Sequence, residues 1–372
     1  MSKLKVRFVV VFCVLILACS MSLATNALAS SEDWDKVIAA AKAEGTVVMY
    51  APSGRVANAG KAFEEKYGIK VESAKMQDVD VVERIIREHD AGIHSVDLAW
   101  IEDPAILFYE LIPDGYVENY VPPTHTSLIP EEYQNPLIFL FQVRMIGYNS
   151  ETYSESPIKS LWDLTTQEWE GKLVTRNPMV TSPHLSWFSE LVTRSDELAA
   201  DYEARFGEPL ELTTPNAGWE FIKRLAENRP VLVTSDTDAG DAVGARGQDQ
   251  PPLGLYVLGK HRDVELKDLA LEVATDITPV IGYHYPAYLQ MIANAPHPNA
   301  AKLFISFLLD EEGVSAWTCD LGAYSTNPAV AALPEDPIGG LSDWAKVTWT
   351  YDAETAASTR GEVLDFWIRH AR

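Results

Sequence analysis

The sequence predicts an α/β protein with two lobes, and three observations lead to that class. Helical and extended patterns alternate from Asp35 to Ile101, a long apolar extended segment spans Pro136 to Asn149, and a second alternating series follows it. Strands that alternate with helices indicate a parallel sheet covered on both faces. The extended segment is the expected crossing between two such units, because a fresh α/β series starts after it.

The first 29 residues are predicted to be an export signal that is removed from the mature protein. Basic residues lie within the first seven positions, and the apolar run Phe8–Ala18 is too short to span a membrane comfortably. The small residues of Ala27–Ala29 form a signal-peptidase pattern, so cleavage is expected before Ser30. The alternative is a lipoprotein signal, "ILAC", with lipidation of Cys19. The periplasm is the expected compartment.

Composition narrows the class of protein further. Two of the three cysteines lie in the signal, so the mature chain keeps only Cys319 and relies on an apolar core rather than on disulfides. Loss of the basic signal changes the formal net charge from −24 to −27. A surface this acidic argues against nucleic acid as a partner, because nucleic-acid binding depends on Lys and Arg. A soluble monomer is expected, since no second apolar run approaches membrane-spanning length.

The first lobe is expected to begin with helices and strands in strict alternation. The predicted segments are the helix Trp34–Gly45, the strand Thr46–Ala51, a helix capped by Ser53, the strand 69–74, a helix capped by Asp78 and the strand Ser95–Ile101.

The strand ends of this lobe supply the first candidate binding residues, because ligands of such sheets bind outside the carboxyl ends of the strands. Ser53, Gly54 and Arg55 combine a hydroxyl, a flexible backbone and a guanidinium at a helix start. That combination suits a carboxylate or a phosphate, and a capped helix with an exposed arginine is the alternative. Asp78 and Glu102 follow the next two strands and are expected in the same wall.

The second lobe offers strand-end loops of its own. Its predicted elements are the strand 172–175, the helix Thr181–Val192, the helix Ala217–Asn228 and the strand 231–240.

Candidate binding residues also follow the strands of this second lobe. Arg176 ends a strand, Thr181 or Ser182 can cap the following helix, and His184 lies one turn into it. Asp236 is one of three nearby aspartates. These acids are either oxygen ligands for a cation or for sugar hydroxyls, or solvated acids of a turn.

The stretch "GYHYPAYL" (282–289) concentrates aromatic side chains. Tyr283 and Tyr285 share one face of an expected extended strand, while His284 points to the other face. Three uses stay open for the two tyrosines: aromatic packing at a hinge, hydrogen bonds to an organic ligand, and ligation of iron. Metal ligation requires several hard oxygens that converge on one point.

Several stretches carry a family likeness, namely "VVMYAPSGR", "GYNSETY", "PHPNAAKLFISFLL" and "GAYSTNP". They resemble the periplasmic solute-binding proteins of ABC importers, in the two-lobed branch that includes ferric-iron binders. The resemblance implies a type II periplasmic-binding-protein-like fold, with two α/β lobes joined by two crossing strands and an ABC permease as partner. It implies that residues 30–140 begin lobe 1, residues 141–278 form lobe 2, and residues 279–372 supply the return crossing, the rest of lobe 1 and a helical tail.

The resemblance leaves two kinds of ligand open. Iron binders of this family present a tandem tyrosine pair, whereas this chain has no Tyr-Tyr and carries "SDTDAGDAVGARGQDQ" in the corresponding region. Ferric iron, alone or with an anion, and a small phosphorylated or carboxylated organic anion are both candidates. No catalytic motif or phosphate-binding glycine loop is present, so a carrier without a resident cofactor is expected rather than an enzyme. A receptor for a membrane sensor has the same signature.

Overall fold

The computed structural model describes residues 32–371. The predicted export signal, its cleavage before Ser30 and the alternative lipidation of Cys19 lie outside the described residues. Within the described range, none of the helices has the length and apolar character needed to cross a membrane.

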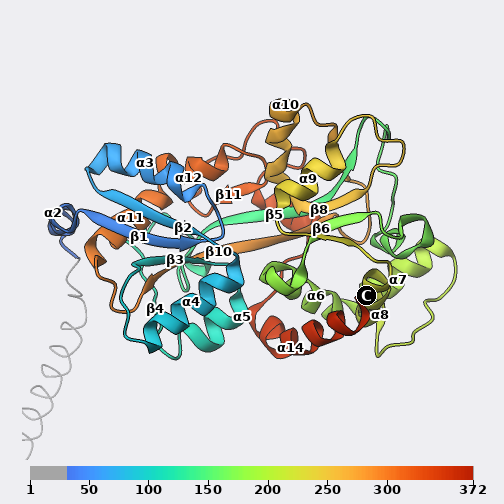
Figure 1. Ribbon diagram of the computed structural model, residues 1–372, viewed down its shortest axis with the longest axis horizontal. Helices are drawn as coiled ribbons and strands as arrows, with labels where there is room; N and C mark the ends of the chain where they lie inside the picture. The colour runs from blue at the N-terminus through green and yellow to red at the C-terminus, as the bar shows by residue number, and fades with distance from the viewer. Residues whose placement is uncertain (1–31, 372) are drawn as a thin grey trace, which may run out of the picture.

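Two lobes share one sheet that runs along the molecule (Figure 1). Across residues 32–371 the sheet has eleven strands, and its main path is β2-β1-β3-β10-β5-β8-β6-β7. The long strands β5 (Ile138–Asn149) and β10 (Gly282–Ile292) lie antiparallel at its centre and pass from one lobe to the other. The predicted α/β architecture of two lobes with two crossing strands is confirmed.

Lobe 1 packs helices against the parallel strands at one end of the sheet. Its elements are α2 (Trp34–Glu44), β1 (Thr46–Ala51), α3 (Val56–Tyr67), β2 (Lys70–Lys75), α4 (Asp78–Asp90), β3 (Leu98–Ile101), α5 (Pro104–Ile106), η1 (Leu107–Leu111), β4 (Val117–Glu118), η2 (Glu131–Tyr133), α11 (Pro298–Leu309), α12 (Glu311–Thr318) and β11 (Ala323–Ser325).

The strand order of lobe 1 brings three strand ends to one edge. β1 pairs in parallel with β2 on one side and with β3 on the other. Gly45 supplies the left-handed residue (φ 73°) that ends α2 and lets the chain turn into β1. The loops that follow all three strands consequently face lobe 2, where a site between the lobes would lie.

Lobe 2 is built around the other halves of the two crossing strands. Its elements are η3 (Leu161–Thr165), η4 (Gln167–Trp169), β6 (Leu173–Arg176), η5 (Pro178–Val180), α6 (Ser182–Thr193), α7 (Ser195–Phe206), α8 (Ala217–Glu227), β7 (Val231–Val233), α9 (Asp236–Gly244), β8 (Leu253–Val257), η6 (Leu258–Arg262), α10 (Asp263–Lys267) and β9 (Leu271–Val273).

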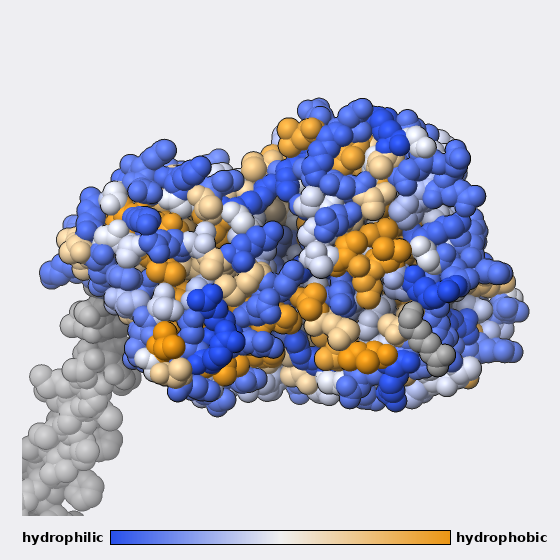
Figure 2. Space-filling model, viewed as in Figure 1, coloured by the Kyte–Doolittle hydropathy of each residue, from blue (hydrophilic) through white to orange (hydrophobic). Residues whose placement is uncertain are grey.

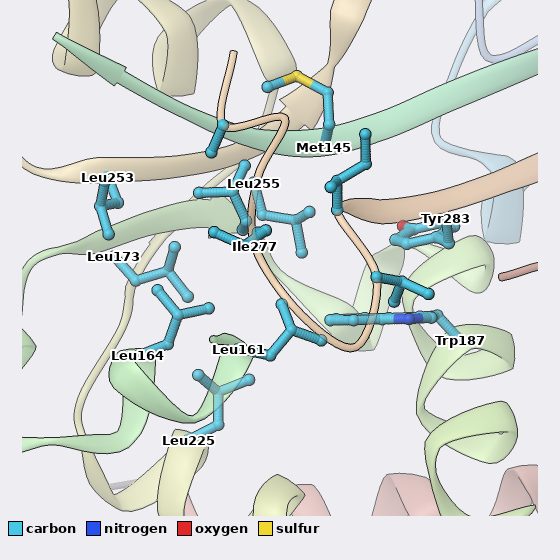
Figure 3. Packing of buried hydrophobic residues seen from close by; sticks show 14 of the residues in the cluster. Met145, Leu161, Leu164, Leu173, Trp187, Leu225, Leu253, Leu255, Ile277 and Tyr283 are labelled. Carbon is cyan, nitrogen blue, oxygen red and sulfur yellow. The ribbon is translucent and has the colours of Figure 1, made fainter. Parts of the chain in front are cut away.

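The core of lobe 2 reaches the return strand. Buried apolar side chains of the sheet, η3, α6 and α8 meet on one side of the sheet (Figure 3). Trp187 of α6 stacks on Tyr283 of β10, with ring centroids 5.2 Å apart. This contact fixes Tyr283 as part of the packing between the crossing strand and lobe 2.

The C-terminal segment, expected to end in a helical tail, contacts both lobes. α13 (Leu341–Val347) lies against β10, and α14 (Ala353–His370) packs on α6 and α8 of lobe 2 and reaches α5 of lobe 1 (Figure 1). Arg360 of α14 also forms an ion pair with the buried Asp103 of lobe 1. The last helix therefore joins the lobes beside the two crossing strands.

The two helix caps predicted for lobe 1 are wrong. Arg55 rather than Ser53 occupies the N-cap position of α3, and no side chain caps that helix. Asp78 is the first residue of α4, and Gln77 precedes it as the N-cap residue. Asp78 instead accepts the N–H of Ser182, and the Ser53 hydroxyl accepts the N–H of Arg55 and the indole N–H of Trp317.

Lobe 2 also departs from the local prediction. Thr181 occupies the N-cap position of α6 but makes no capping hydrogen bond. The strand predicted over 231–240 ends at Val233, because the Ser235 side chain accepts a hydrogen bond from the N–H of Asp238 and starts α9. Asp236 is consequently a helix residue in the first turn of α9, not an acid of a solvated turn.

Candidate functional site

A cavity of about 790 Å³ lies between the two lobes. The surface is hollowed between the lobes, with mostly hydrophilic residues around the hollow (Figure 2). Its walls come from the strand-end loops of lobe 1, the crossing strands, the strand-end loops of lobe 2, η6 and residues 317–323. Both lobes therefore contribute side chains to one space.

The candidate binding residues from the sequence divide into two groups. Those that line the cavity are Ser53, Gly54, Arg55, Glu102, Arg176, Asp236 and Tyr285. Those that lie outside its wall are Asp78, Thr181, Ser182, His184 and Tyr283.

Asp236 holds two arginines in one part of the wall. Its side chain, 13% exposed, forms an ion pair with Arg144 of β5 and lies 3.8 Å from Arg176 of β6. Burial alone would raise the pKa of Asp236, but the two guanidinium groups outweigh burial and lower this pKa to about 2. Asp236 is therefore ionised at neutral pH, and it keeps two buried cations in place.

Asp320 holds a second pair of arginines in another part of the wall. Its side chain forms ion pairs with Arg55 at the start of α3 and with Arg262 in η6. Arg55 also donates to the carbonyl of Ala316 at 2.7 Å, and Arg262 donates to the carbonyl of Gly259 at 2.8 Å. The carboxylate thus links lobe 1 to lobe 2 beside the crossing strands.

Lys260 has no such carboxylate partner. Its ammonium donates to the hydroxyl of Thr237 at 2.8 Å, and it forms no ion pair within residues 32–371. Burial lowers the pKa of Lys260, and the nearby Arg262 lowers it further. Lys260 is therefore a partly buried cation of the wall that has no ion pair among the described residues, although Asp236 and Asp263 lie near enough to oppose the lowering of its pKa.

Glu102 is a buried carboxyl group of the wall that forms no ion pair within residues 32–371. The residue is 3% exposed, and its Oε1 accepts a hydrogen bond from Gln142 at 3.3 Å. Burial, and then the charge of Asp78, raise the pKa of Glu102 to about 8, against the opposing effect of Arg144 and Arg176. At neutral pH this carboxyl group is mostly the neutral acid.

The charges of the wall leave a positive excess. The cationic side chains in the wall are Arg55, Lys75, Arg144, Arg176, Lys260 and Arg262, and the acidic ones are Asp80, Glu102, Asp236 and Asp320. With Glu102 neutral, the cations among these lining residues exceed the acids by about three, and two acids outside the wall, Asp78 and Asp263, lie beside Arg176 and Arg262. This excess stands out in a chain with a formal net charge of −24.

Tyr283 belongs to a buried hydrogen-bond chain. The hydroxyl of Thr175 donates to the carbonyl of Leu255, so it accepts from Nε2 of His184 at 2.8 Å. Nδ1 of His184 then accepts from the hydroxyl of Tyr283 at 2.8 Å. Burial, and then Arg144, hold the pKa of His184 well below its usual range, and burial raises the pKa of Tyr283. All three side chains are therefore neutral.

The two lobes touch where α4 and α6 begin. The carboxylate of Asp78 accepts the N–H of Ser182 at 2.6 Å and lies 3.7 Å from Arg176. Gln77 donates to the carbonyl of Thr234 at 3.3 Å. These contacts from lobe 1 to lobe 2 close one side of the cavity, and they account for the positions of Asp78 and Ser182 outside its wall.

Sequence reasoning missed several charged and polar residues of the wall. Among them are Lys75, Asp80, Gln142, Arg144, Lys260, Arg262 and Asp320. Arg144 could have been found, because it is the one charged residue in the apolar stretch "PLIFLFQVRMIGYN", and a charge in a buried strand needs a partner. The others lie in segments without a distinguishing local pattern, and only the fold brings them to the cavity.

The chain matches the family model described as "Bacterial extracellular solute-binding protein" over residues 58–348. The chain belongs to this family. A family of solute-binding proteins implies a small ligand and a location outside the cytoplasm. No curated protein matches the chain.

Solved structures share the whole fold at low sequence identity. Iron-bound HitA from Pseudomonas aeruginosa aligns with a TM-score of 0.67 and 18% identity, over 88% of this chain and 99% of that one. AfuA from Actinobacillus pleuropneumoniae, with fructose 6-phosphate bound, aligns with a TM-score of 0.67 and 19% identity, over 88% and 98%. The substrate-binding protein of an ABC transporter from Agrobacterium tumefaciens aligns with a TM-score of 0.64 and 16% identity, over 88% of this chain and 94% of that one. The fold is therefore that of two-lobed periplasmic binding proteins.

Proposed function

We propose that this protein is exported to the periplasm, captures a small organic anion between its lobes and delivers it to the transmembrane subunits of an ABC permease. The observation that carries the proposal is the positive excess in a cavity of an otherwise acidic protein. A phosphate monoester or a di- or tricarboxylate fits this excess, because arginine and lysine are the usual partners of such groups.

The donor set of the cavity favours an organic anion over ferric iron. A ferric site needs several anionic oxygens that converge. Of the two tyrosines considered as iron ligands, Tyr283 donates to His184 outside the cavity wall, and Tyr285 is the one phenol among the residues that line it. Asp236 and Asp320 are each held by two arginines. Across residues 32–371, no cluster of three or more His, Cys, Asp or Glu side chains is placed to hold a metal ion.

Closure on the solute follows from the distribution of the cations. Arg55 belongs to lobe 1, Lys260 and Arg176 to lobe 2, and Arg144 to a crossing strand. A solute stabilises the closed form only through contacts that the open form lacks. An anion that reaches cations of both lobes meets this requirement, and the closed complex is what a permease would receive.

A thermal-shift screen of protein stripped of ligand tests the proposal. Fructose 6-phosphate, citrate and inorganic phosphate are added in the presence of a metal chelator, and ferric chloride is added without it. A bound anion at one hundred times its Kd stabilises the folded protein by about 2.7 kcal/mol. We expect stabilisation by at least one of the anions with chelator present.

The variant Tyr283→Phe separates the anion from iron. It removes the phenolic oxygen but keeps the ring that stacks on Trp187. We expect anion binding by this variant to equal that of the wild type. Stabilisation by ferric chloride alone, with a tyrosinate-to-iron absorption band that Tyr283→Phe or Tyr285→Phe abolishes, would overturn the proposal.

A further inference from the structure

Glu102 occupies an unusual place for an acid in a site that binds anions. It follows β3 directly, faces the cavity and forms no ion pair within residues 32–371. Its hydrogen-bond partner is the neutral amide of Gln142, and its Oε2 has no hydrogen-bond partner in the described part of the chain. One carboxyl oxygen is therefore free to meet a solute.

Charged and titratable groups surround Glu102 from every neighbouring element. They are Asp78 of α4, Arg144 of β5, Arg176 of β6, Asp236 of α9, and the phenols Tyr283 and Tyr285 of β10 and Tyr351. The adjacent Asp103 is paired with Arg360.

The arginines near Glu102 are committed to other acids. Arg144 is paired with Asp236, and Arg176 lies between Asp236 and Asp78. An anionic solute in this space would face an ionised Glu102 at short range, with little water to screen the repulsion. A protonated carboxyl group removes the repulsion and offers an O–H donor in its place.

We propose that Glu102 is a specificity-determining residue that binds the solute as a neutral acid and donates its O–H to an anionic oxygen of that solute. The inference rests on the proposed capture of an anion, and it adds the class of contact that selects the solute. A phosphate or carboxylate oxygen accepts this hydrogen bond. Binding above about pH 8 then requires uptake of a proton, because the raised pKa of Glu102 leaves it ionised there when the cavity is empty.

Isothermal titration calorimetry with fructose 6-phosphate, in two buffers that differ in ionisation enthalpy, measures this proton. A phosphate monoester is fully ionised at about pH 9, so its own titration does not contribute. The wild type is expected to take up close to one proton per solute at about pH 9 and almost none through Glu102 at pH 7. Its Kd is expected to rise about tenfold between these two values.

The variant Glu102→Gln supplies a permanent neutral donor. It is expected to keep a Kd within a few-fold of the wild type at pH 7, to lose the tenfold rise and to lose the proton uptake. Burial also lowers the pKa of Lys260 in the same wall, so the difference in proton uptake between the wild type and Glu102→Gln is the quantity that reports on Glu102. Glu190→Gln is the matched control: burial also raises the pKa of Glu190, but this residue pairs with Arg194 outside the cavity wall. It is expected to behave as the wild type.

Two results would overturn the role of Glu102 while the proposed function stands. One is binding of fructose 6-phosphate at about pH 9 without proton uptake by the wild type. The other is equal uptake by the wild type and Glu102→Gln. If fructose 6-phosphate, citrate and inorganic phosphate all fail to bind at pH 7, the proposed function fails instead. In that case infrared spectroscopy tests the protonation of Glu102 without a solute. If the carbonyl band of a protonated carboxylic acid is absent from the spectrum of the wild type at pH 7, the inference is overturned.

Discussion

Two regions of the cavity shift the pKa of a carboxyl group in opposite directions. Asp236 lies between Arg144 and Arg176, and its pKa falls to about 2, whereas Glu102 has only a neutral partner, and its pKa rises to about 8. Burial pushes both pKa values upward. The difference teaches that the cations within reach of a carboxyl group, and not its burial alone, set its charge in this wall.

Asp236→Ala should give the largest change, because it removes the acid from the cationic region. Arg144, only 1% exposed, would keep its charge without the carboxylate that neutralises it. Loss of one partner of a buried ion pair costs about 3–5 kcal/mol. We expect a loss of that size in the free energy of unfolding, measured by urea denaturation. Asp238→Ala, two residues further along α9 and exposed, is the control, and equal losses in both variants would contradict the comparison.

Glu102→Gln should change how stability depends on pH. The folded pKa of Glu102, about 8, exceeds the ordinary value of 4.5. The stabilising contribution of the neutral acid is therefore complete below about pH 4.5 and is lost as the pH rises through about 8. Relative to the variant, the free energy of unfolding of the wild type should fall by a few kcal/mol between pH 5 and 9. Urea midpoints across this range provide the measurement, and parallel pH profiles for the two proteins would refute the assignment.

Lys260→Met tests the wall cation that forms no ion pair within residues 32–371. Because a charge-assisted hydrogen bond contributes about 1.5–3 kcal/mol, we expect the Kd for an anion to rise by roughly 10- to 100-fold. The ligand-free variant should be at least as stable as the wild type, since Lys260 has no ion pair to lose. Lys267→Met removes a surface lysine paired with Asp241 and should leave the Kd unchanged. An unchanged Kd in Lys260→Met would exclude this lysine from anion binding.

Asp78→Asn should give the smallest change in stability. Asp78 is intermediate between Asp236 and Glu102, because it has one arginine nearby. Burial raises the pKa of Asp78 although Arg176 lies 3.7 Å away, so one cation at this distance does not reverse burial. Asparagine can still accept the N–H of Ser182, so we expect a loss of only about 1 kcal/mol in stability. Small-angle X-ray scattering should detect a more open ligand-free form. Asp90→Asn, at the exposed end of α4, is the control, and an unchanged scattering profile in Asp78→Asn would count against a closing role.

Part of the site could be predicted from the sequence, because strand ends can be read locally. Ser53, Arg55, Glu102 and Arg176 follow predicted strands, Asp236 lies near the end of the predicted strand 231–240, and all five line the cavity. Their presence in the wall follows from the general rule for parallel sheets. Their role in binding stays a prediction that the variants above test.

The failed cap prediction at Asp78 has a long-range cause. Asp78 and Thr181 were assigned local capping roles, but Asp78 bonds to the other lobe and Thr181 makes no capping hydrogen bond. Helix signals are read within a few residues, whereas Asp78 and Ser182 are 104 residues apart. No local pattern indicates a partner at that distance.

The sequence by itself determined the alternation of strands and helices, the crossing segment Pro136–Asn149 and the strand edge at which the candidate site lies. These features follow from hydrophobic periodicity and from glycine and polar residues at element ends, which act over a few positions. The tertiary structure alone decided which acids of the wall are ionised and which cations of the wall have no carboxylate partner. The pairs that set those charges join residues 92 apart for Arg144 and Asp236, and 265 apart for Arg55 and Asp320, so they exist only once the lobes have formed and met.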